Sequence, residues 1–172
     1  ELALAPFESH AHPENPYTLH AELQQCMNDL VGIIRKADEI EEALAKLAEL
    51  RTRVHHVSVE GGRVSNPGWH LAIDMRNMLL VSECVAKAAL ARTESRGGHT
   101  RDDYPDMDPN WRNTLLVCRA TGDDQVVPDV TVTPESQLPM REDLLATFEL
   151  SELEKYYTAQ ELAEHPDRKG GA

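Results

Sequence analysis

Apolar residues recur at helical spacing in two stretches near the start of the chain. In residues 17–36 and again in residues 38–57 they fall three or four positions apart, with charged residues on the opposite face. The apolar positions are Leu19, Leu23, Met27, Leu30 and Ile34 in the first stretch, and Ile40, Leu44, Leu47, Leu50, Val54 and Val57 in the second. Each stretch therefore predicts an amphipathic helix with one face in a core.

A third stretch, residues 67–93, is apolar around more of its circumference. Its apolar residues include Trp69, Ala72, Ile73, Met75, Met78, Leu79, Leu80, Val81, Val85, Ala86 and Ala89. A helix of this kind is usually buried on more than one side. The two amphipathic helices cover one side, so the rest needs a further segment of this chain or another domain. We predict a mainly α fold built on an antiparallel, spectrin-repeat-like bundle of three helices.

Capping residues indicate where these helices begin. Asn15 and Asn66 each precede a proline, which a first helical turn tolerates. Asp38 and Glu41 have the spacing of a capping box, with Asp38 in the capping position. All three predicted helices therefore have a start signal.

The chain changes character after the third helix. Residues 94–112 are rich in glycine, proline and charge, and predict a loop. Residues 114–119 and 125–132 then form two short alternating stretches with Gly122-Asp123 between them, which predicts a short β-hairpin. Pro128 has no backbone N–H, so the second strand is expected at an edge.

We divide the chain into three parts. Residues 1–16, which hold three prolines, form a connector, and residues 17–112 form the three-helix domain. Residues 113–172 form a C-terminal extension with the hairpin and an acidic tail. The tail contains two capping boxes, which predict short helices. They are Ser151 with Glu154 and Thr158 with Glu161.

Charge and composition exclude several classes of partner. The formal net charge is −13, whereas non-specific nucleic-acid binding needs clustered lysine and arginine. No apolar run approaches the ~20 residues that cross a bilayer, so we expect no direct membrane insertion. The three cysteines lie far apart and predict neither a disulfide framework nor a thiolate cluster, which favours a reducing cytoplasm.

No pattern for catalysis, cofactor binding or metal binding is present in the sequence. The chain lacks a phosphate-binding glycine motif and a nucleophile motif. Its eight histidines, among them His10 and His12 of the connector, lack the ligand spacing of a zinc site. We therefore assign no catalytic, cofactor-binding or metal-binding residue.

The densest group of charges lies between Arg92 and Arg112. This segment holds four arginines, five acidic residues and His99. Such a mixture can form a network of charge-assisted hydrogen bonds. Two interpretations stay open, a solvated charged loop and a loop ordered against a partner surface.

Residues 94–105, which we call the signature loop, resemble part of a known family. They read Glu-Ser-Arg-Gly-Gly-His-Thr-Arg-Asp-Asp-Tyr-Pro. This resembles the signature of the C-terminal helical domain of succinate dehydrogenase and fumarate reductase flavoproteins, in which Gly98 is usually alanine. Residues 23–35 and 40–51 resemble the first two helices of that domain. The segment that begins at Trp111 is one residue shorter than in the family and lacks its histidine, so no role for that histidine is carried over.

The resemblance implies a structural domain whose active site lies elsewhere. In this family the FAD, the dicarboxylate site and the proton donor belong to upstream domains, so FAD is expected in the full-length subunit and none in this chain. The signature loop is expected to lock the domain onto the flavin-binding domain of the same chain. The candidate interface residues are Glu94, Ser95, Arg96, Gly97, His99, Arg101, Asp103, Tyr104, Pro105 and, outside the loop, Arg35.

The resemblance also implies partners for the whole subunit. Such a subunit interconverts succinate and fumarate, exchanges electrons with an iron–sulfur subunit, and meets a flavinylation or assembly factor. It is expected in the cytoplasm, peripheral at the inner face of the membrane through its partner subunits. Two alternatives stay open, an L-aspartate oxidase-like flavoprotein with a similar loop and a free-standing helical interaction module. The long extension after the loop favours succinate dehydrogenase or fumarate reductase.

Overall fold

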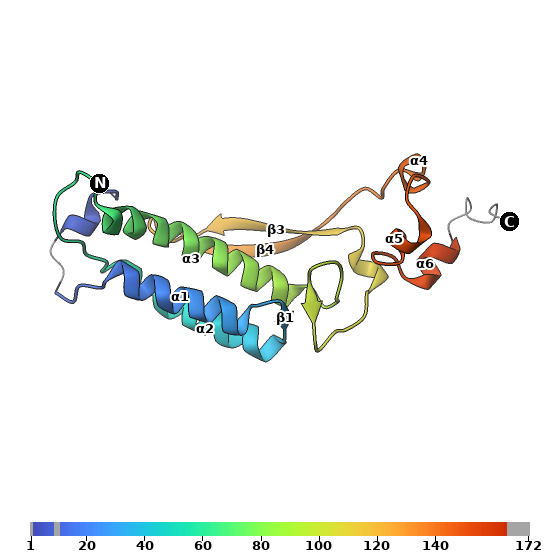
Figure 1. The fold of residues 1–172 in the computed structure, drawn as a ribbon, viewed down its shortest axis with the longest axis horizontal. Helices are drawn as coiled ribbons and strands as arrows, with labels where there is room; N and C mark the ends of the chain where they lie inside the picture. Colours follow the sequence, from blue (N-terminus) through green and yellow to red (C-terminus); the bar gives the residue numbers. More distant parts are fainter. Residues whose placement is uncertain (1, 9–10, 165–172) are drawn as a thin grey trace.

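The computed structural model describes residues 2–8 and 11–164. Three long helices lie side by side along the long axis of the molecule, and each runs opposite to the one before it in the chain (Figure 1). They are α1 (Pro16–Leu30), α2 (Ala37–Val54) and α3 (Pro67–Ala91). The predicted antiparallel three-helix bundle is therefore confirmed.

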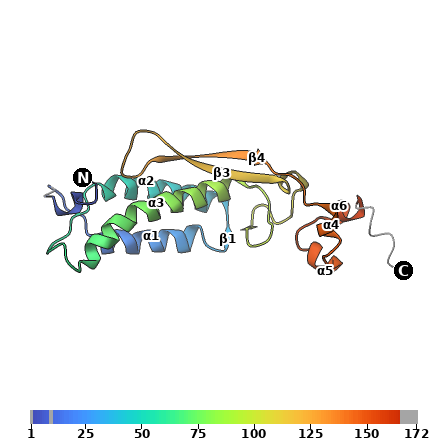
Figure 2. The same cartoon turned by 90° about the horizontal axis from the view of Figure 1, so that it is seen from above.

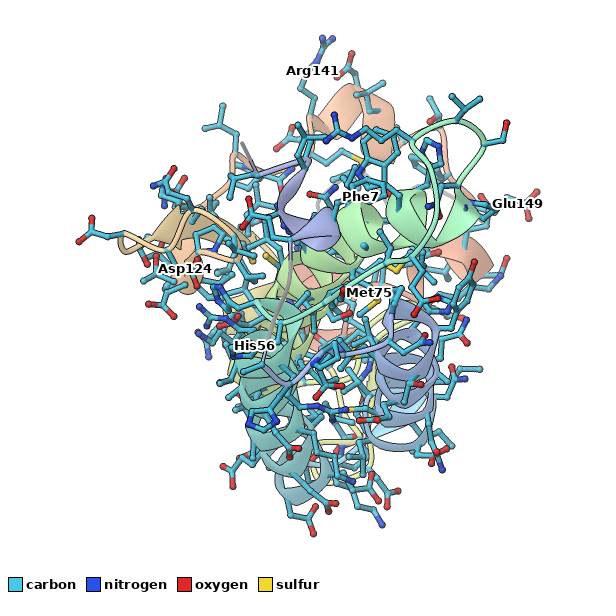
Figure 3. The ribbon with its side chains drawn as sticks, turned by 90° about the vertical axis from the view of Figure 1, so that its left-hand side faces the viewer. Phe7, His56, Met75, Asp124, Arg141 and Glu149 are labelled. Atoms are coloured by element: carbon cyan, nitrogen blue, oxygen red, sulfur yellow. The ribbon has the colours of Figure 1, made fainter. Side chains whose placement is uncertain are left out.

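The core of the bundle consists of the apolar positions that the helical spacing predicts. Leu19, Ile40 and Met75 have no exposed surface, and Leu47 is 1% exposed. Met75, labelled in Figure 3, marks the face of α3 that packs on the other two helices. Because apolar packing has no directional requirement, the helical period alone is enough to place these residues inside.

Helices α1 and α3 begin at their predicted capping residues. The Asn15 side chain accepts a hydrogen bond from the Tyr17 N–H at 2.8 Å, and Asn66 accepts one from Trp69 at 3.1 Å. The predicted capping box of α2 is wrong, because Asp38 accepts only from the adjacent Glu39 N–H.

The prediction of where the first helix ends is also wrong. Helix α1 ends at Leu30, and Ile34–Arg35 form the short strand β1 instead of a last helical turn. Gly32 allows this change, because a Cβ there would lie 2.8 Å from the Asn28 carbonyl oxygen. Ile34, predicted to face the core, is 64% exposed. Helices α2 and α3 end three and two residues before their predicted ends.

The predicted hairpin is confirmed, with its second strand shifted. Strand β3 (Thr114–Thr121) pairs antiparallel with β4 (Asp129–Ser136), whereas residues 125–132 were expected for the second strand. The shift arises because the Asp124 side chain accepts from the N–H groups of Val126 and Val127 and holds them in a turn. Figure 2 shows the hairpin lying along the bundle, where it covers part of the apolar surface of α3.

In their described residues, the two terminal regions form short helices. Near the start, η1 (Ala5–Phe7) packs on α3, with the Phe7 ring 5.4 Å from that of Trp69 (Figure 3). The tail forms α4 (Glu142–Leu145), α5 (Leu150–Leu153) and α6 (Ala159–Glu164). The last part of the predicted acidic tail, residues 165–172, lies outside the described residues.

One of the two capping boxes of the tail is confirmed. Thr158 and Glu161 exchange hydrogen bonds at the start of α6. The other box lies at Glu149 and Glu152, so the assignment to Ser151 and Glu154 is wrong. Within residues 2–8 and 11–164, no helix is both long and apolar enough to cross a membrane.

Candidate functional site

The signature loop lies at the end of the bundle where α1 turns into α2 and α3 ends (Figure 1). Its strand β2 (Thr100–Arg101) pairs in parallel with β1. The Asp102 N–H continues this pairing by donating to the Arg35 carbonyl at 2.9 Å. The loop thereby joins the α1–α2 connection to the end of α3.

Arg101 closes the C-terminal end of α3. Its side chain is buried, and Nη1 donates to the carbonyl oxygens of Ala89 at 2.8 Å, Leu90 at 3.1 Å and Arg92 at 3.2 Å. The last carbonyls of a helix have no partner within the helix and carry partial negative charge. A guanidinium group both satisfies and neutralises them.

Asp103 connects this cation to the start of α2. Its carboxylate accepts two hydrogen bonds of 2.7 Å from Arg101 and one of 3.1 Å from the Ala37 N–H, the first residue of α2. An anion at a helix N-terminus and a cation at a helix C-terminus are both stabilising. The Arg101 hydrogen bond is the main reason that the pKa of Asp103 falls to about 2. The pair therefore fills the role predicted for Asp38.

Glu94 is a second buried charge and has three donors. Its carboxylate accepts from Arg92 at 2.5 Å, from Arg96 at 3.0 Å and from the Asp108 N–H at 2.9 Å. Burial raises the pKa of this carboxyl, but the hydrogen bonds from Arg96, Asp108 and Arg92 outweigh it, and the pKa lies below its usual value. Glu94 is thus a carboxylate held by two guanidinium groups.

His99 is held in one neutral tautomer by its neighbours. Arg35 Nη1 lies 2.9 Å from His99 Nδ1, and because a guanidinium only donates, Nδ1 must accept. The other ring nitrogen therefore carries the proton and donates to the Arg92 carbonyl at 3.3 Å. Burial lowers the pKa of His99, and the charge of Arg35 acts in the same direction.

A tight turn closes the loop at its two glycines. Arg96 and His99 exchange backbone hydrogen bonds of 2.8 and 3.0 Å. Gly97 has φ +59°, where a side chain is strained, so glycine is needed there. Gly98 has open space around the position of a Cβ. The alanine that is usual in the family therefore fits at Gly98.

Two arginines connect the loop region to the tail. Arg96 donates to the carbonyls of Asp108 and Tyr156. The Arg112 guanidinium lies 3.7 Å from the centre of the Tyr157 ring and pairs with Glu161 at 3.4 Å. The charges of the segment are therefore satisfied largely within the chain, which corrects the interpretation of a purely solvated loop.

The candidate interface residues separate into internal and exposed groups. Glu94 and Arg101 are buried, and Arg35, Ser95, Arg96 and His99 are half-buried. Gly97, Asp103, Tyr104 and Pro105 are exposed. Ser95 holds the loop's shape, since its hydroxyl accepts from the Arg101 N–H and lies 2.8 Å from the Tyr104 carbonyl. The exposed residues offer the most surface for direct contact with a partner.

Ile33 and Ile34 are exposed beside the signature loop, although the helical spacing predicted Ile34 on a core-facing stripe. They are 81% and 64% exposed on the α1–α2 connection, and Ile34 pairs with Thr100 of the loop. Tyr104, 43% exposed, packs on the Arg101 guanidinium at 5.0 Å. We call Ile33, Ile34, Tyr104 and Pro105 the end patch. Gly32, which interrupts the helical pattern just before Ile33, was the signal available in the sequence.

The described residues contain no grouping of metal-binding side chains, and the starts of the long helices are partly capped. Within residues 2–8 and 11–164, no three His, Cys, Asp or Glu side chains are grouped to hold a metal ion, and His10 lies outside these residues. Dinucleotide phosphates usually bind at a free helix N-terminus. In each of the three long helices one N–H group of the first turn already has a side-chain partner, which is Asn15 in α1, Asp103 in α2 and Asn66 in α3.

Comparison with known proteins gives the family. The family model of the fumarate reductase flavoprotein C-terminal domain matches residues 20–151. In a solved structure of Mycobacterium smegmatis Sdh1 in complex with UQ1, the matched region is 76% identical and has a TM-score of 0.83. That match covers 96% of this chain and 28% of the Sdh1 chain.

Two curated relatives extend the comparison. The fumarate reductase flavoprotein subunit of Helicobacter pylori strain J99 is 37% identical over 105 residues, which is 60% of this chain and 15% of that subunit. L-aspartate oxidase of Streptomyces coelicolor is 32% identical over 128 residues, which is 72% of this chain and 21% of the oxidase. The chain belongs to the family of fumarate reductase flavoprotein C-terminal domains. It spans about a fifth or less of these two relatives.

Proposed function

We propose that the chain is the C-terminal structural domain of a flavoprotein subunit that interconverts succinate and fumarate with FAD. Its task is to dock on the flavin-binding part of that subunit and stabilise it. The observation that carries this proposal is the end patch, whose exposed side chains lie on the signature loop and on the adjoining α1–α2 connection. Hydrogen bonds between charged groups hold this part of the chain in shape. Large exposed apolar side chains on an ordered surface are typical of interaction sites.

The internal ion pairs support docking rather than catalysis. A docking surface benefits from rigidity, because a preorganised loop loses little conformational freedom on binding. Arg101, Asp103 and Glu94 supply that rigidity, because their charges are held by hydrogen bonds within the chain. The domain therefore contributes shape to the enzyme, and the chemistry belongs to the upstream part.

The proposed partners follow from this assignment. The flavin-binding part binds FAD, an iron–sulfur subunit exchanges electrons with the flavin, and a flavinylation or assembly factor acts during maturation. The assembled subunit lies in the cytoplasm, at the inner face of the membrane through its partner subunits. The direct partner of the end patch is the flavin-binding part of the same polypeptide.

An L-aspartate oxidase is the second candidate. It is favoured by the match to the Streptomyces oxidase, which covers more of this chain than the Helicobacter match does. The 76% identity to Sdh1 over nearly the whole chain supports succinate dehydrogenase more strongly.

Mixing the chain with the separately expressed upstream part of its subunit tests the proposal. We expect tight association and a rise in dye-coupled succinate oxidation that depends on the chain. An upstream part that is equally active alone would refute the stabilising role. Oxidation of L-aspartate without oxidation of succinate would select the second candidate.

A further inference from the structure

Helix α3 and strand β3 run side by side in a register that brings two distant cysteines together. Arg92 Nη2 donates to the Thr114 carbonyl at 2.7 Å, and Cys118 Sγ lies 3.8 Å from the Cys84 carbonyl oxygen. Eight helical residues span about 12 Å and four strand residues about 13 Å. The spacing from Arg92 to Cys84 therefore matches that from Thr114 to Cys118.

The side chains of both cysteines lie in the contact between helix and strand. On β3, the alternation of a strand places Thr114, Leu116 and Cys118 on one face. Cys118 is paired with Val132, next to the buried Val130 of β4. Both thiols are half-buried and free, so a small oxidant reaches them without unfolding of the core.

Polar contacts hold the hairpin close to α3 on both sides of the cysteines. Lys87 Nζ donates to the Val130 carbonyl at 2.7 Å, and Lys87 also pairs with the buried Glu83 at 2.6 Å. At the far end, Arg92 holds Thr114. The two thiols therefore stay near each other in the folded protein, as a disulfide requires.

We propose that Cys84 and Cys118 are a redox-active pair that closes a disulfide when hydrogen peroxide is the oxidant. The Cys118 sulfur attacks one peroxide oxygen, the O–O bond breaks, and a sulfenic acid and one water form. The Cys84 sulfur then attacks the sulfenic sulfur and releases a second water. Two thiols are oxidised to one disulfide, and one peroxide is reduced to two waters.

The raised pKa of Cys84 agrees with its role as the thiol that reacts second. Burial, followed by the neighbouring Cys118 thiol, raises the pKa of Cys84. A raised pKa leaves less of Cys84 as the reactive thiolate, so Cys84 reacts slowly with dissolved peroxide. A sulfenic acid held beside Cys84 offsets this by proximity, because the reaction is then intramolecular. The disulfide would enclose the signature loop, since residues 94–105 lie between the two cysteines.

Peptide mapping of the full-length subunit under non-reducing conditions tests this proposal. After peroxide treatment we expect a peptide pair joined through Cys84 and Cys118, and its loss on reduction with dithiothreitol. C84S and C118S should lack it, and C26S, which changes the buried Cys26, should retain it. In C84S, dimedone should trap a sulfenic acid on Cys118.

Hydrogen exchange of the oxidised protein gives a second readout. We expect the β3 amides to exchange roughly tenfold more slowly than in the reduced protein, because the crosslink restricts opening of the hairpin. Separate overoxidation of the two cysteines, or crosslinks from either one to another partner, without the joined pair would overturn the proposal. So would joined peptides that persist in C118S.

Discussion

The bundle core and the signature loop both contain fully buried side chains, but they are built by different rules. In the core, apolar side chains such as Leu47 and Met75 pack without directional contacts. In the loop, the buried Arg101 and Glu94 each depend on several particular partners. The core therefore needs a pattern of residue types, whereas the loop needs individual residues.

Removing the buried cation of the loop should have the largest effect. In Arg101→Met, the carbonyls of Ala89, Leu90 and Arg92 and the Asp103 carboxylate lose their hydrogen bonds from Arg101. We therefore expect a loss of about 3–5 kcal/mol in the free energy of unfolding. Urea denaturation measures it. Arg119→Ala, which breaks the exposed pair with Glu135, is the control and should change stability by about 1 kcal/mol or less. Equal effects of the two variants would contradict a structural role for Arg101.

Conservative changes sharpen the contrast between the two regions. Leu47→Ala should lose about 2–5 kcal/mol by leaving a cavity, but Leu47→Met should lose less than about 1.5 kcal/mol. Arg101→Lys should remain clearly destabilised, because an ammonium group cannot reproduce the fork of hydrogen bonds. The same denaturation curves compare the three variants. If the Arg101→Lys protein were as stable as the Leu47→Met protein, the loop would tolerate conservative changes as well as the core does, which would contradict the contrast between them.

The two loop glycines should respond differently to alanine. Gly97→Ala forces a side chain into the left-handed region and should lose about 1–2 kcal/mol. Gly98→Ala meets no neighbour and should be neutral or stabilising by up to about 1 kcal/mol. Thermal unfolding of both variants checks this pair. A reversed order would mean that the turn at residues 96–99 has another backbone conformation.

The neutral His99 should add a small pH dependence. Its pKa is lower in the folded chain than the ordinary value of 6.5, so the unfolded state binds more protons between the two values. Stability is then complete above about pH 6.5 and falls as the pH drops through this window. We expect His99→Gln to flatten this slope in pH-dependent unfolding curves. A wild-type slope in the variant would place the effect on another group.

The carboxylates of Glu94 and Asp103 add a pH dependence of stability at more acidic pH. The pKa values of Glu94 and Asp103 are lowered in the fold, so their stabilisation is present above the ordinary values of 4.5 and 3.8 and is lost as the pH falls below them. The loss of stabilisation by the carboxylates therefore begins at a lower pH than the loss from His99.

Much of the fold was accessible from the sequence, because it rests on period and capping. The apolar stripes that contain Leu19 and Ile40 predicted helices. The capping residues Asn15 and Asn66 predicted where two of the three helices begin. The exact ends were not accessible, since the end of α1 depends on the pairing of Ile34 with Thr100, a contact between residues far apart in the chain. Long-range pairing leaves no trace in local periodicity.

The candidate site was only partly accessible. The resemblance picked out Glu94, Arg101 and Asp103, but their partners were not predictable, because Arg101 reaches carbonyls of α3 and Asp103 reaches the start of α2. The exposed Ile33 and Ile34 were missed for the same reason, since the helical period placed Ile34 in the core. Whether the ten candidate residues form a domain interface stays a prediction.

The affinity of the chain for the separately expressed upstream part is the most direct test of docking by the end patch. Ile34→Glu places a charge in the patch, and we expect its dissociation constant to rise about tenfold or more. Val64→Glu is the control, because Val64 is 89% exposed in the connection at the opposite end of the bundle. It should bind like the wild type. An Ile34→Glu chain that binds with wild-type affinity, or a Val64→Glu chain weakened equally, would contradict the account.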